Sequence, residues 1–359
     1  MLKKTKILLG MLSVLVLAGA GCIQFSGSSQ GPMGVFASTD GADTWKQKNT
    51  LVTNQGIKNV SNAKVFRIFT DPSDAKALYM ATRGQGLNYS YDRGETWAAS
   101  PELANKFIYG LAVHPTDTCT MYVTDGPNVY RTTNCQRTWE IVFTEARPTQ
   151  RLVALAIDYA NPTIVYAAEA GGDVFRSKDS GKSWQLIKSF NLELRHLAVD
   201  PFNPKRVYVA SYTQGLFRSE DNGDSWQTAN GGFESYNGSL TFYRLVFSPT
   251  EKNTLFWISR YGIFRSTNGG DTWTEMKLLT PPGSVNIYAF AVNPKNISEM
   301  YYTATSLGDS SQSVRSTLYK TTDGGTNWVT KKLPTNTIPI EILINKDNGN
   351  NILVGFTTL

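Results

Sequence analysis

Histidine and cysteine are scarce in this chain of 359 residues, which contains two and three of them respectively. A zinc site needs three or four such ligands close together, so zinc chemistry is not expected. The basic excess is also small, at 35 Lys and Arg against 29 Asp and Glu, and no basic run alternates with aromatic residues. Nucleic-acid binding is therefore not expected. The sequence has no Ser-His-Asp spacing and no phosphate-binding loop, and it indicates neither a metal nor another cofactor.

One long apolar run is present, "ILLGMLSVLVLAGAG" (7–21), and it follows Lys3, Lys4 and Lys6. At 15 residues it is shorter than the roughly 20 that a membrane-spanning helix needs, so residues 1–21 are interpreted as an export signal. Small residues followed by Cys22 resemble the lipobox of bacterial lipoproteins, which implies a diacylated Cys22. Without the signal the chain has 32 basic and 29 acidic residues, because three of the 35 lie within it, and the net charge falls from +6 to +3.

An ordinary signal peptidase cutting after Ala18-Gly19-Ala20 is the alternative, and it would leave Cys22 as a free thiol. Gly19 also stands where a lipobox usually has Leu. Residues 22–34 are rich in Ser and Gly and are expected to form a short flexible tether. The predicted location is the periplasm or outer surface, with the lipid of Cys22 holding the folded body at a membrane.

The stretch "FRSEDNGDSW" (217–226) is one of seven similar phrases that cover most of the chain. Their tryptophans are 52, 42, 45, 42, 47 and 55 residues apart, which is the spacing of four-stranded propeller blades. The phrase resembles the BNR or Asp-box repeat of sialidases, sortilin-type receptors, xyloglucanases and photosystem II assembly factors. The principal box residues are Asp40, Trp45, Asp92, Trp97, Asn134, Trp139, Asp179, Trp184, Asp221, Trp226, Asn268, Trp273, Asp323 and Trp328.

The box has the chemistry of a hairpin turn. Its Asp accepts backbone N–H groups, its Gly supplies a positive φ, and its Trp buries a large apolar surface beneath the turn. Asn134 and Asn268 are expected to keep the turn, because an amide oxygen also accepts N–H groups. Ala42 and Gln136 replace the Gly and are expected to strain it. The box residues are thus predicted to be structural, and the resemblance implies that they lie away from the binding face.

A second phrase alternates with the first: an apolar strand, a turn rich in Pro or Asn, and another apolar strand, as in "HLAVDPFNPKRVYVAS" (196–211). One blade is this hairpin followed by an Asp-box hairpin. The chain opens on an unpaired box half (35–48) and closes on an unpaired strand-pair half (338–359). Joining them predicts an all-β domain, a single seven-bladed propeller over residues 35–359, closed by its two ends. Six or eight blades are the alternatives.

Alternating strand direction places the 1–2 and 3–4 turns, including the boxes, on one face, which we call the turn face. The 2–3 and 4–1 connections lie on the other, the loop face, and three of them are long: 46–64, 227–241 and 304–317. Ligand binding is expected among these loops. The candidate ligand-binding residues, on or near the innermost strands, are Arg67, Arg151, Arg195, His196 and Arg244. Clustered guanidinium groups could clamp a carboxylate or sulfate, and the alternative is that these arginines are solvated or ion-paired.

A non-catalytic, monomeric module that binds a protein or polysaccharide is the first functional hypothesis, with sortilin-type receptors and assembly factors as precedents. A surface glycoside hydrolase is the second. "FRIF" (66–69) is similar to a sialidase phrase, yet no Tyr–Glu pair can be assigned. "YVTDGPNVYR" (122–131) is similar to the phrase around a catalytic Asp of xyloglucanases, which cleave between two propellers. The weak catalytic candidates are Asp125, Glu169 and Glu234.

Cys119 and Cys135 fall in the 1–2 turn and the Asp-box turn of the same predicted blade. Both turns emerge on the same face from adjacent hairpins, so the two residues can approach within bonding distance. Export exposes the protein to oxidising conditions, and a disulfide is therefore predicted. The alternative is two unrelated buried thiols.

Overall fold

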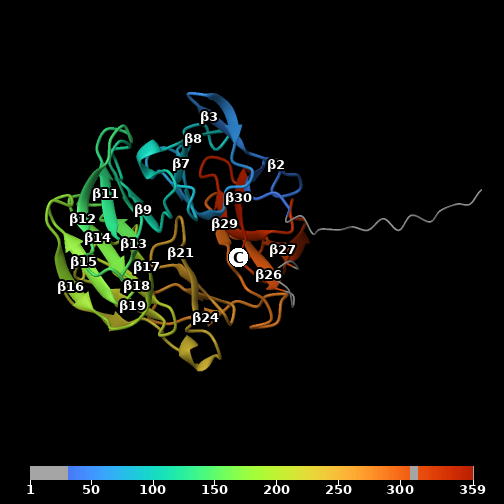
Figure 1. The fold of residues 1–359 in the computed structure, drawn as a ribbon. Helices are drawn as coiled ribbons and strands as arrows, with labels where there is room; N and C mark the ends of the chain where they lie inside the picture. The colour runs from blue at the N-terminus through green and yellow to red at the C-terminus, as the bar shows by residue number, and fades with distance from the viewer. Residues whose placement is uncertain (1–30, 308–313, 359) are drawn as a thin grey trace, which may run out of the picture.

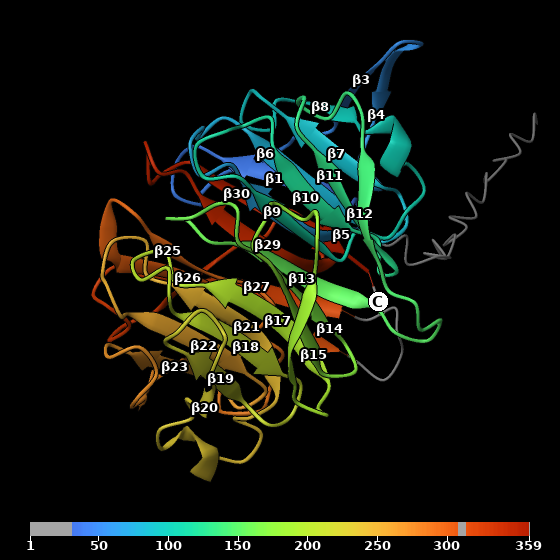
Figure 2. The same cartoon turned by 90° about the vertical axis from the view of Figure 1, so that its left-hand side faces the viewer.

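The computed structural model describes residues 31–307 and 314–358 and is a seven-bladed β-propeller with four-stranded antiparallel blades, as predicted. Figures 1 and 2 show the seven sheets arranged around a common centre, with inner strands such as β9, β13, β17 and β21 toward the middle. No helix in the described residues is long and apolar enough to span a membrane. The predicted signal, Cys22 and most of the predicted tether lie outside these residues.

Blades 1 to 6 follow one another along the chain, each running from an inner first strand to an outer fourth strand. Blade 1 has β5 (Val65–Thr70), β6 (Leu78–Thr82), β7 (Leu87–Ser90) and β8 (Thr96–Ala99); blade 2 has β9 (Gly110–Val113), β10 (Met121–Thr124), β11 (Asn128–Thr132) and β12 (Glu140–Thr144); blade 3 has β13 (Leu152–Ile157), β14 (Val165–Glu169), β15 (Asp173–Ser177) and β16 (Gln185–Ser189). Blade 4 has β17 (Leu194–Val199), β18 (Val207–Ser211), β19 (Leu216–Ser219) and β20 (Gln227–Thr228); blade 5 has β21 (Phe242–Phe247), β22 (Leu255–Ser259), β23 (Ile263–Ser266) and β24 (Thr274–Glu275); blade 6 has β25 (Phe290–Asn293), β26 (Asn296–Leu307), β27 (Val314–Thr321) and β28 (Val329–Lys331).

Blade 7 joins the two ends of the chain and confirms the predicted closure. Its strand order is β2-β1-β30-β29, from β2 (Lys46–Gln47) and β1 (Gly34–Ser38) to β30 (Ile352–Thr357) and β29 (Ile338–Ile344). Strands β1 and β30 are antiparallel, in a register that runs from Gly34 opposite Phe356 to Ser38 opposite Ile352. The ring is thus sealed by backbone hydrogen bonds between residues more than 300 positions apart.

The hydrophobic core is divided into seven clusters, one between each pair of neighbouring blades. Second strands such as β14 and β18 are buried along their whole length, because each sheet is covered on both faces by its neighbours. This explains why the second phrase reads as apolar runs rather than as strict alternation. Every blade therefore depends on two neighbours for its burial.

The Asp-box turn of blade 4 shows the local reason for the repeat. The Ser225 backbone N–H donates to Asp221 Oδ1 at 2.8 Å, and the Ser225 hydroxyl donates to Oδ2 at 2.6 Å. Ser219 Oγ accepts the Gly223 N–H at 2.7 Å, where the φ of Gly223 is 92°. Asn134 and Asn268 form the same turn through Oδ1, each accepting the N–H of the Thr four residues on at 3.0 Å. The expectation that Asn preserves the box is confirmed.

Acid should weaken the boxes that contain Asp. Their hydrogen bonds, led by those from the residue four positions on, lower the pKa of Asp179, Asp221 and Asp323 from 3.8 to about 2. A carboxyl whose pKa is lower in the folded state than in the unfolded state stabilises the fold at pH values above its unfolded-state pKa. This stabilisation is lost as the pH falls through the folded-state pKa. We expect the melting temperature to fall between about pH 4 and pH 2, and Asp221→Asn to reduce that fall. The variant copies the natural box that contains Asn268. If Asp221→Asn lost as much melting temperature between about pH 4 and pH 2 as the unmodified protein, the Asp-box carboxylates would not be the cause of the acid sensitivity.

Ala42 and Gln136 occupy the Gly position with φ of 76° and 65°, as the sequence predicted. A side chain in this left-handed region costs about 1–2 kcal/mol. Gln136 is also buried with no hydrogen-bond partner for Oε1 among the described residues. We expect Gln136→Gly to stabilise the protein by about 1 kcal/mol in urea unfolding. Gly223→Ala is the matched control and should destabilise, because the alanine would have to adopt the φ of 92° found at Gly223. A stabilising Gly223→Ala with a destabilising Gln136→Gly would show that the positive φ is not a source of strain here.

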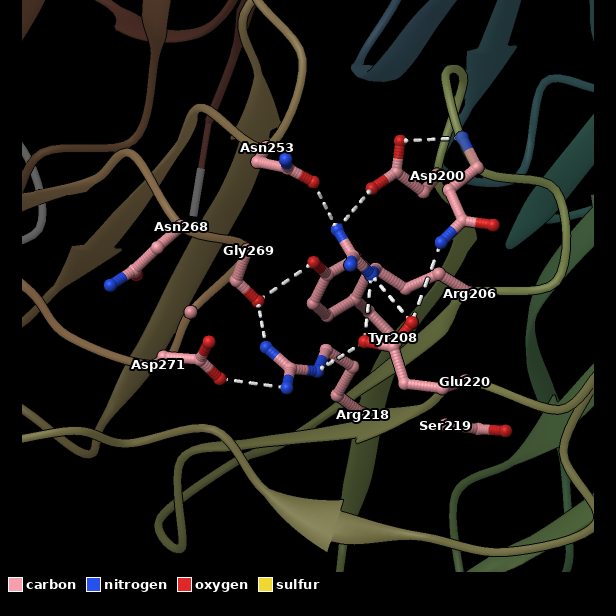
Figure 3. A network of polar contacts seen from close by, with 12 residues as sticks. Asp200, Arg206, Tyr208, Arg218, Ser219, Glu220, Asn253, Asn268, Gly269 and Asp271 are labelled. Carbon is pink, nitrogen blue, oxygen red and sulfur yellow. Dashed lines mark hydrogen bonds and ion pairs between the residues drawn. The ribbon is translucent and has the colours of Figure 1, made fainter.

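Tyr and Arg side chains tie each of three Asp-boxes to the preceding blade, and Figure 3 shows this contact between blades 4 and 5. Tyr208 Oη and Arg218 Nη1 both donate to the carbonyl of Gly269, at 2.9 and 2.6 Å. Arg218 also contacts Glu220 and Asp271. The same two-donor contact joins blades 2 and 3 and blades 3 and 4, through Tyr122 with Arg131 and Tyr166 with Arg176. In blades 2, 3 and 4 the contact therefore comes from the Tyr of the second strand and the Arg of the third strand.

The long connector 46–64 contains regular secondary structure that the sequence analysis did not predict. It forms a hairpin of β3 (Thr50–Thr53) and β4 (Gly56–Asn59), and β3 pairs in parallel with β8 to widen blade 1 to six strands. The hairpin projects from the rim of the disc (Figure 2). In connector 227–241, a short 3-10 helix (Phe233–Ser235) buries Phe233 against Trp257, with ring centroids 5.4 Å apart. Both loops are structured because they pack on neighbouring blades, which their composition did not reveal.

Candidate functional site

The central channel carries polar side chains at one repeated position of the inner strands, which we call the ring position. In blades 1, 3, 4, 5 and 7, the register of the first strand shifts by one residue just before it, so the chain has a bulge there. A bulge re-aims the side chains beside it. In order from blade 1 to blade 7, the ring position holds Arg67, Gly110, Ala154, His196, Arg244, Ala289 and Glu341.

Arg67 and His196 meet across the channel from blades 1 and 4, with Arg67 Nη1 3.3 Å from His196 Nδ1. Burial, then the charges of Arg67 and Arg244, hold the pKa of His196 well below its usual 6.5. His196 is therefore neutral at pH 7, and Nδ1 accepts the proton that Arg67 donates. Burial and Arg244 lower the pKa of Arg67 to about 10, so this guanidinium is still charged. No carboxylate pairs with Arg67 among the described residues.

Arg244 makes three contacts with blades 6 and 7, one from each of its nitrogens. Its Nη1 forms an ion pair with Glu341 Oε1 at 2.5 Å, Nε donates to the Tyr288 carbonyl at 3.1 Å, and Nη2 donates to the Ile340 carbonyl at 2.6 Å. Both charged side chains are about nine-tenths buried. Taken together, the side chains at the seven ring positions include the Arg244–Glu341 ion pair, the neutral imidazole of His196 and the positive charge of Arg67, which has no carboxylate partner among the described residues.

The structure brings together three of the five predicted ligand-binding residues and leaves two outside. Arg67, His196 and Arg244 line one cavity of about 400 Å³. Arg151 and Arg195 are exposed on the loop face, where Arg151 donates to Tyr109 Oη at 3.0 Å. Arg195 pairs with Glu193 and lies over the Tyr212 ring, 4.6 Å from its centroid. The sequence analysis did not identify Glu341 as a site residue. Its position in the second phrase, four residues before the turn, is the same as that of Arg67, His196 and Arg244 and could have identified it.

Aromatic residues immediately precede four of the ring positions and were also missed: Phe66, Tyr109, Tyr243 and Tyr288. They lie on the loop-face side of the ring position, and all four are partly exposed. Tyr109 stacks on Phe107 at 4.2 Å, and Tyr243 lies 5.8 Å from Tyr288. With Arg83, which lies 5.7 Å from the Phe66 centroid, and with Arg151 and Arg195, they form what we call the arginine–aromatic rim.

The three weak catalytic candidates lie toward the loop face in different parts of the ring: Asp125 and Glu234 are in connections, and Glu169 is the last residue of β14. Asp125 is held by Lys106 Nζ at 2.7 Å and by Tyr130 Oη at 2.9 Å. Glu234 is exposed and accepts the Gly232 N–H. Glu169 is buried beside Arg147, and burial raises the pKa of its carboxyl. The residues do not form a shared cluster with one another.

Cys119 and Cys135 lie side by side on the turn face and form a disulfide in the structure, with Cα atoms 3.8 Å apart. The Cys135 N–H also donates to the Cys119 carbonyl at 3.2 Å. The two turn tips thus approach even more closely than the roughly 4.4–6.8 Å Cα separation that most disulfides show. The pair is remote from the loop face, so its role in the fold is structural.

Comparison with known proteins supports an Asp-box propeller. The family model described as "Sortilin, neurotensin receptor 3" matches residues 172–263, about a quarter of the chain. A xyloglucanase of Paenibacillus sp is 28% identical over 155 residues, covering 43% of this chain and 13% of the relative. A xyloglucanase of Acetivibrio thermocellus is 27% identical over 157 residues, covering 43% and 16%. The chain therefore spans less than a fifth of the length of these curated relatives.

Solved structures agree on the fold. A GH74 xyloglucanase from Xanthomonas campestris aligns with a TM-score of 0.67 and 18% identity, covering 82% of this chain and 51% of that one. YCF48 bound to D1 peptide aligns with a TM-score of 0.60 and 18% identity, covering 83% and 93%. Identities this low establish the propeller architecture alone. The predicted resemblance to the Asp-box propellers is thus confirmed at the level of repeat and fold.

Proposed function

We propose that this seven-bladed Asp-box propeller is a non-catalytic binding module that holds a protein or polysaccharide partner on its loop face. The observation that carries the proposal is the arginine–aromatic rim. Tyr, Phe and Arg are the side chains most enriched at the centres of interfaces, because they bury large areas at low entropic cost. Four aromatic rings and three arginines in one band around the channel mouth are well suited to such contact.

A hollow on the same face adds room for a partner. It has a volume of about 240 Å³ and lies between the 2–3 turn of blade 5 and the connector 277–287. Its lining is largely apolar and includes Met276, Leu278, Pro281 and Val285. Apolar hollows beside an aromatic rim are where anchoring side chains of a partner insert. The hollow is formed largely by connections, whose sequences differ from blade to blade, as binding loops on a repeated scaffold do.

Glycoside hydrolysis is the second candidate, favoured by the curated relatives named xyloglucanase and by Glu169. A carboxyl whose pKa is raised by burial is suited to act as a general acid. Asp173 and Glu145 share Arg147 with Glu169 and would be its nearest carboxylate neighbours. A hydrolase also needs a second carboxylate at a set separation across the sugar, whereas Glu145 and Asp173 are both engaged in ion pairs with Arg147.

The two functions are separated by incubating the purified protein with a panel of plant and bacterial glycans. The binding proposal expects retention of a partner without turnover, weakened about 10-fold by Tyr109→Ala with Arg151→Ala. A pull-down from the native envelope with the same double variant as control identifies a protein partner. Turnover of any glycan that is abolished by Glu169→Gln would establish the hydrolase instead. Capture that is unaffected by the double variant would place the binding site elsewhere.

We further propose that the module is exported and held at a membrane by a diacylated Cys22. The proposal rests on the apolar run 7–21 and on the small residues before Cys22. The loop face would then meet its partner at the cell envelope. Mass spectrometry of the processed N-terminus is the test: a diacylglyceryl adduct on Cys22 is expected. A terminus at Gly21, with an unmodified Cys22, would show ordinary signal cleavage.

A further inference from the structure

The cavity at the ring position extends toward the turn face. Its walls include Phe69, Phe247 and Leu343, which follow the ring position on their inner strands, and Tyr159 in the 1–2 turn of blade 3. Pro72 and Pro201, in the 1–2 turns of blades 1 and 4, lie at its outer end. Because the 1–2 turns belong to the turn face, the cavity opens on the side opposite the arginine–aromatic rim.

The walls and the floor of this cavity differ in chemistry. Phe69, Phe247 and Leu343 are only partly buried, and Tyr159 is 43% exposed. The floor is formed by Arg67, His196 and the Arg244–Glu341 ion pair. Partly exposed apolar walls favour an apolar ligand body, since its burial removes both surfaces from water. At about 400 Å³ the cavity lies within the range of small-molecule sites, roughly 300–1,000 Å³.

The charge of the floor determines what kind of head group it accepts. Glu341 balances Arg244, and the three donors of Arg244 described above are already used. Arg67 is the one cation of the floor that lacks a carboxylate partner among the described residues, and its contact is with a neutral ring nitrogen. Arg67 is partly buried, and a partly desolvated guanidinium without a carboxylate partner is electrostatically unfavourable, so a ligand that carries one negative charge would stabilise it.

We propose that this cavity binds a small monocarboxylate with an apolar body, which enters from the turn face and places its carboxylate on Arg67 beside His196. The planar guanidinium offers two parallel N–H donors to a carboxylate. His196 accepts at Nδ1, so its proton lies on Nε2, which is a second donor in the same floor. A sulfate ion or a phosphate monoester, each of which carries two negative charges at pH 8, would bring one charge more than Arg67 balances. This site is distinct from the loop-face site proposed above and does not depend on it.

The test compares three probes by titration calorimetry on the purified protein: 4-phenylbutyrate, its uncharged amide 4-phenylbutanamide, and phenyl phosphate at pH 8. We expect 4-phenylbutyrate to bind about 10-fold or more tightly than either of the others, since a charge-assisted hydrogen bond contributes that much. Arg67→Met should remove this preference. Arg137→Met, an exposed arginine on the same face, is the matched control and should leave it unchanged.

A gain of binding tests the charge count independently of folding. Glu341→Gln frees the charge of Arg244, so affinity for phenyl phosphate should rise about 10-fold and approach that for 4-phenylbutyrate. Equal binding of acid and amide by the unmodified protein would overturn the proposal. So would tighter binding of phenyl phosphate than of 4-phenylbutyrate before the substitution, or undiminished preference in a folded Arg67→Met variant. Loss of loop-face partner capture would bear on the proposed function alone, because these probes enter from the other face.

Discussion

A chain shortened by residues 342–359 is expected not to fold into a soluble, cooperatively melting monomer. The deletion removes all of β30 and more than a third of β29, so β1 loses its five-residue pairing with β30. The clusters on both sides of blade 7 lose buried residues, including Phe356 on one side and Leu353 on the other. The ring would then have two open sheet edges, which favour aggregation. Circular dichroism, thermal melting and size-exclusion chromatography measure the outcome.

The control is a chain that ends after Thr357, which keeps every paired residue of β30. It should melt within a few degrees of the full-length protein. Restoring the missing strand as a separate peptide of residues 338–359 should recover part of the soluble fraction, because the peptide supplies the same ladder. A shortened chain that stays monomeric and melts in one sharp transition would show that blade 7 is not needed to hold the ring.

Replacing Cys119 and Cys135 by Ser is expected to lower the free energy of unfolding by about 3 kcal/mol, the chain-entropy value for a loop of this size. The loop joins the 1–2 turn of blade 2 to its Asp-box, which has Asn134 and Gln136 in place of Asp and Gly. Gln136 adopts a positive φ, so the turn has less intrinsic stability than a complete box. The covalent bond therefore compensates for a weak turn, and urea unfolding of the two proteins measures its contribution.

A reducing agent provides the control for this prediction. It should lower the melting temperature of the unmodified protein and leave that of the double Ser variant unchanged. Thiol titration of the denatured, unreduced protein should find no free thiol from Cys119 or Cys135. Two free thiols from this pair would contradict the disulfide, whatever the stability of the variant.

Much of the architecture follows from local sequence. Each Asp-box is a self-contained turn, in which the side chain of residue 221, for example, is bonded by residues at most four positions away. Such turns can be recognised one at a time, and their spacing then gives the number of blades. The unmatched half-blades at the two ends gave the closure by the same counting. The structure confirms all three features because they depend on periodicity and on short-range hydrogen bonds.

The candidate sites depend on contacts that local sequence does not contain. Arg67 meets His196 at a separation of 129 residues, and Arg244 meets Glu341 at 97. The positions of Arg67, His196 and Arg244 in the repeat predicted that these side chains lie in the channel. They did not predict which of the two arginines would pair with a carboxylate. The phrase around Glu341 was identified as an inner strand without attention to its charge. Which side chains pair across a channel is a property of the closed ring.

The sequence by itself thus determined the fold class, the blades, the box turns and the pairing of the two ends, since a repeat states each of these locally. The tertiary structure alone decided that connector 46–64 widens blade 1, that Arg151 and Arg195 stay on the loop face, and that the cavity opens on the turn face. These outcomes are set by packing between blades that are distant in the chain. A short segment cannot encode them, because each depends on which neighbour the closed ring brings beside it.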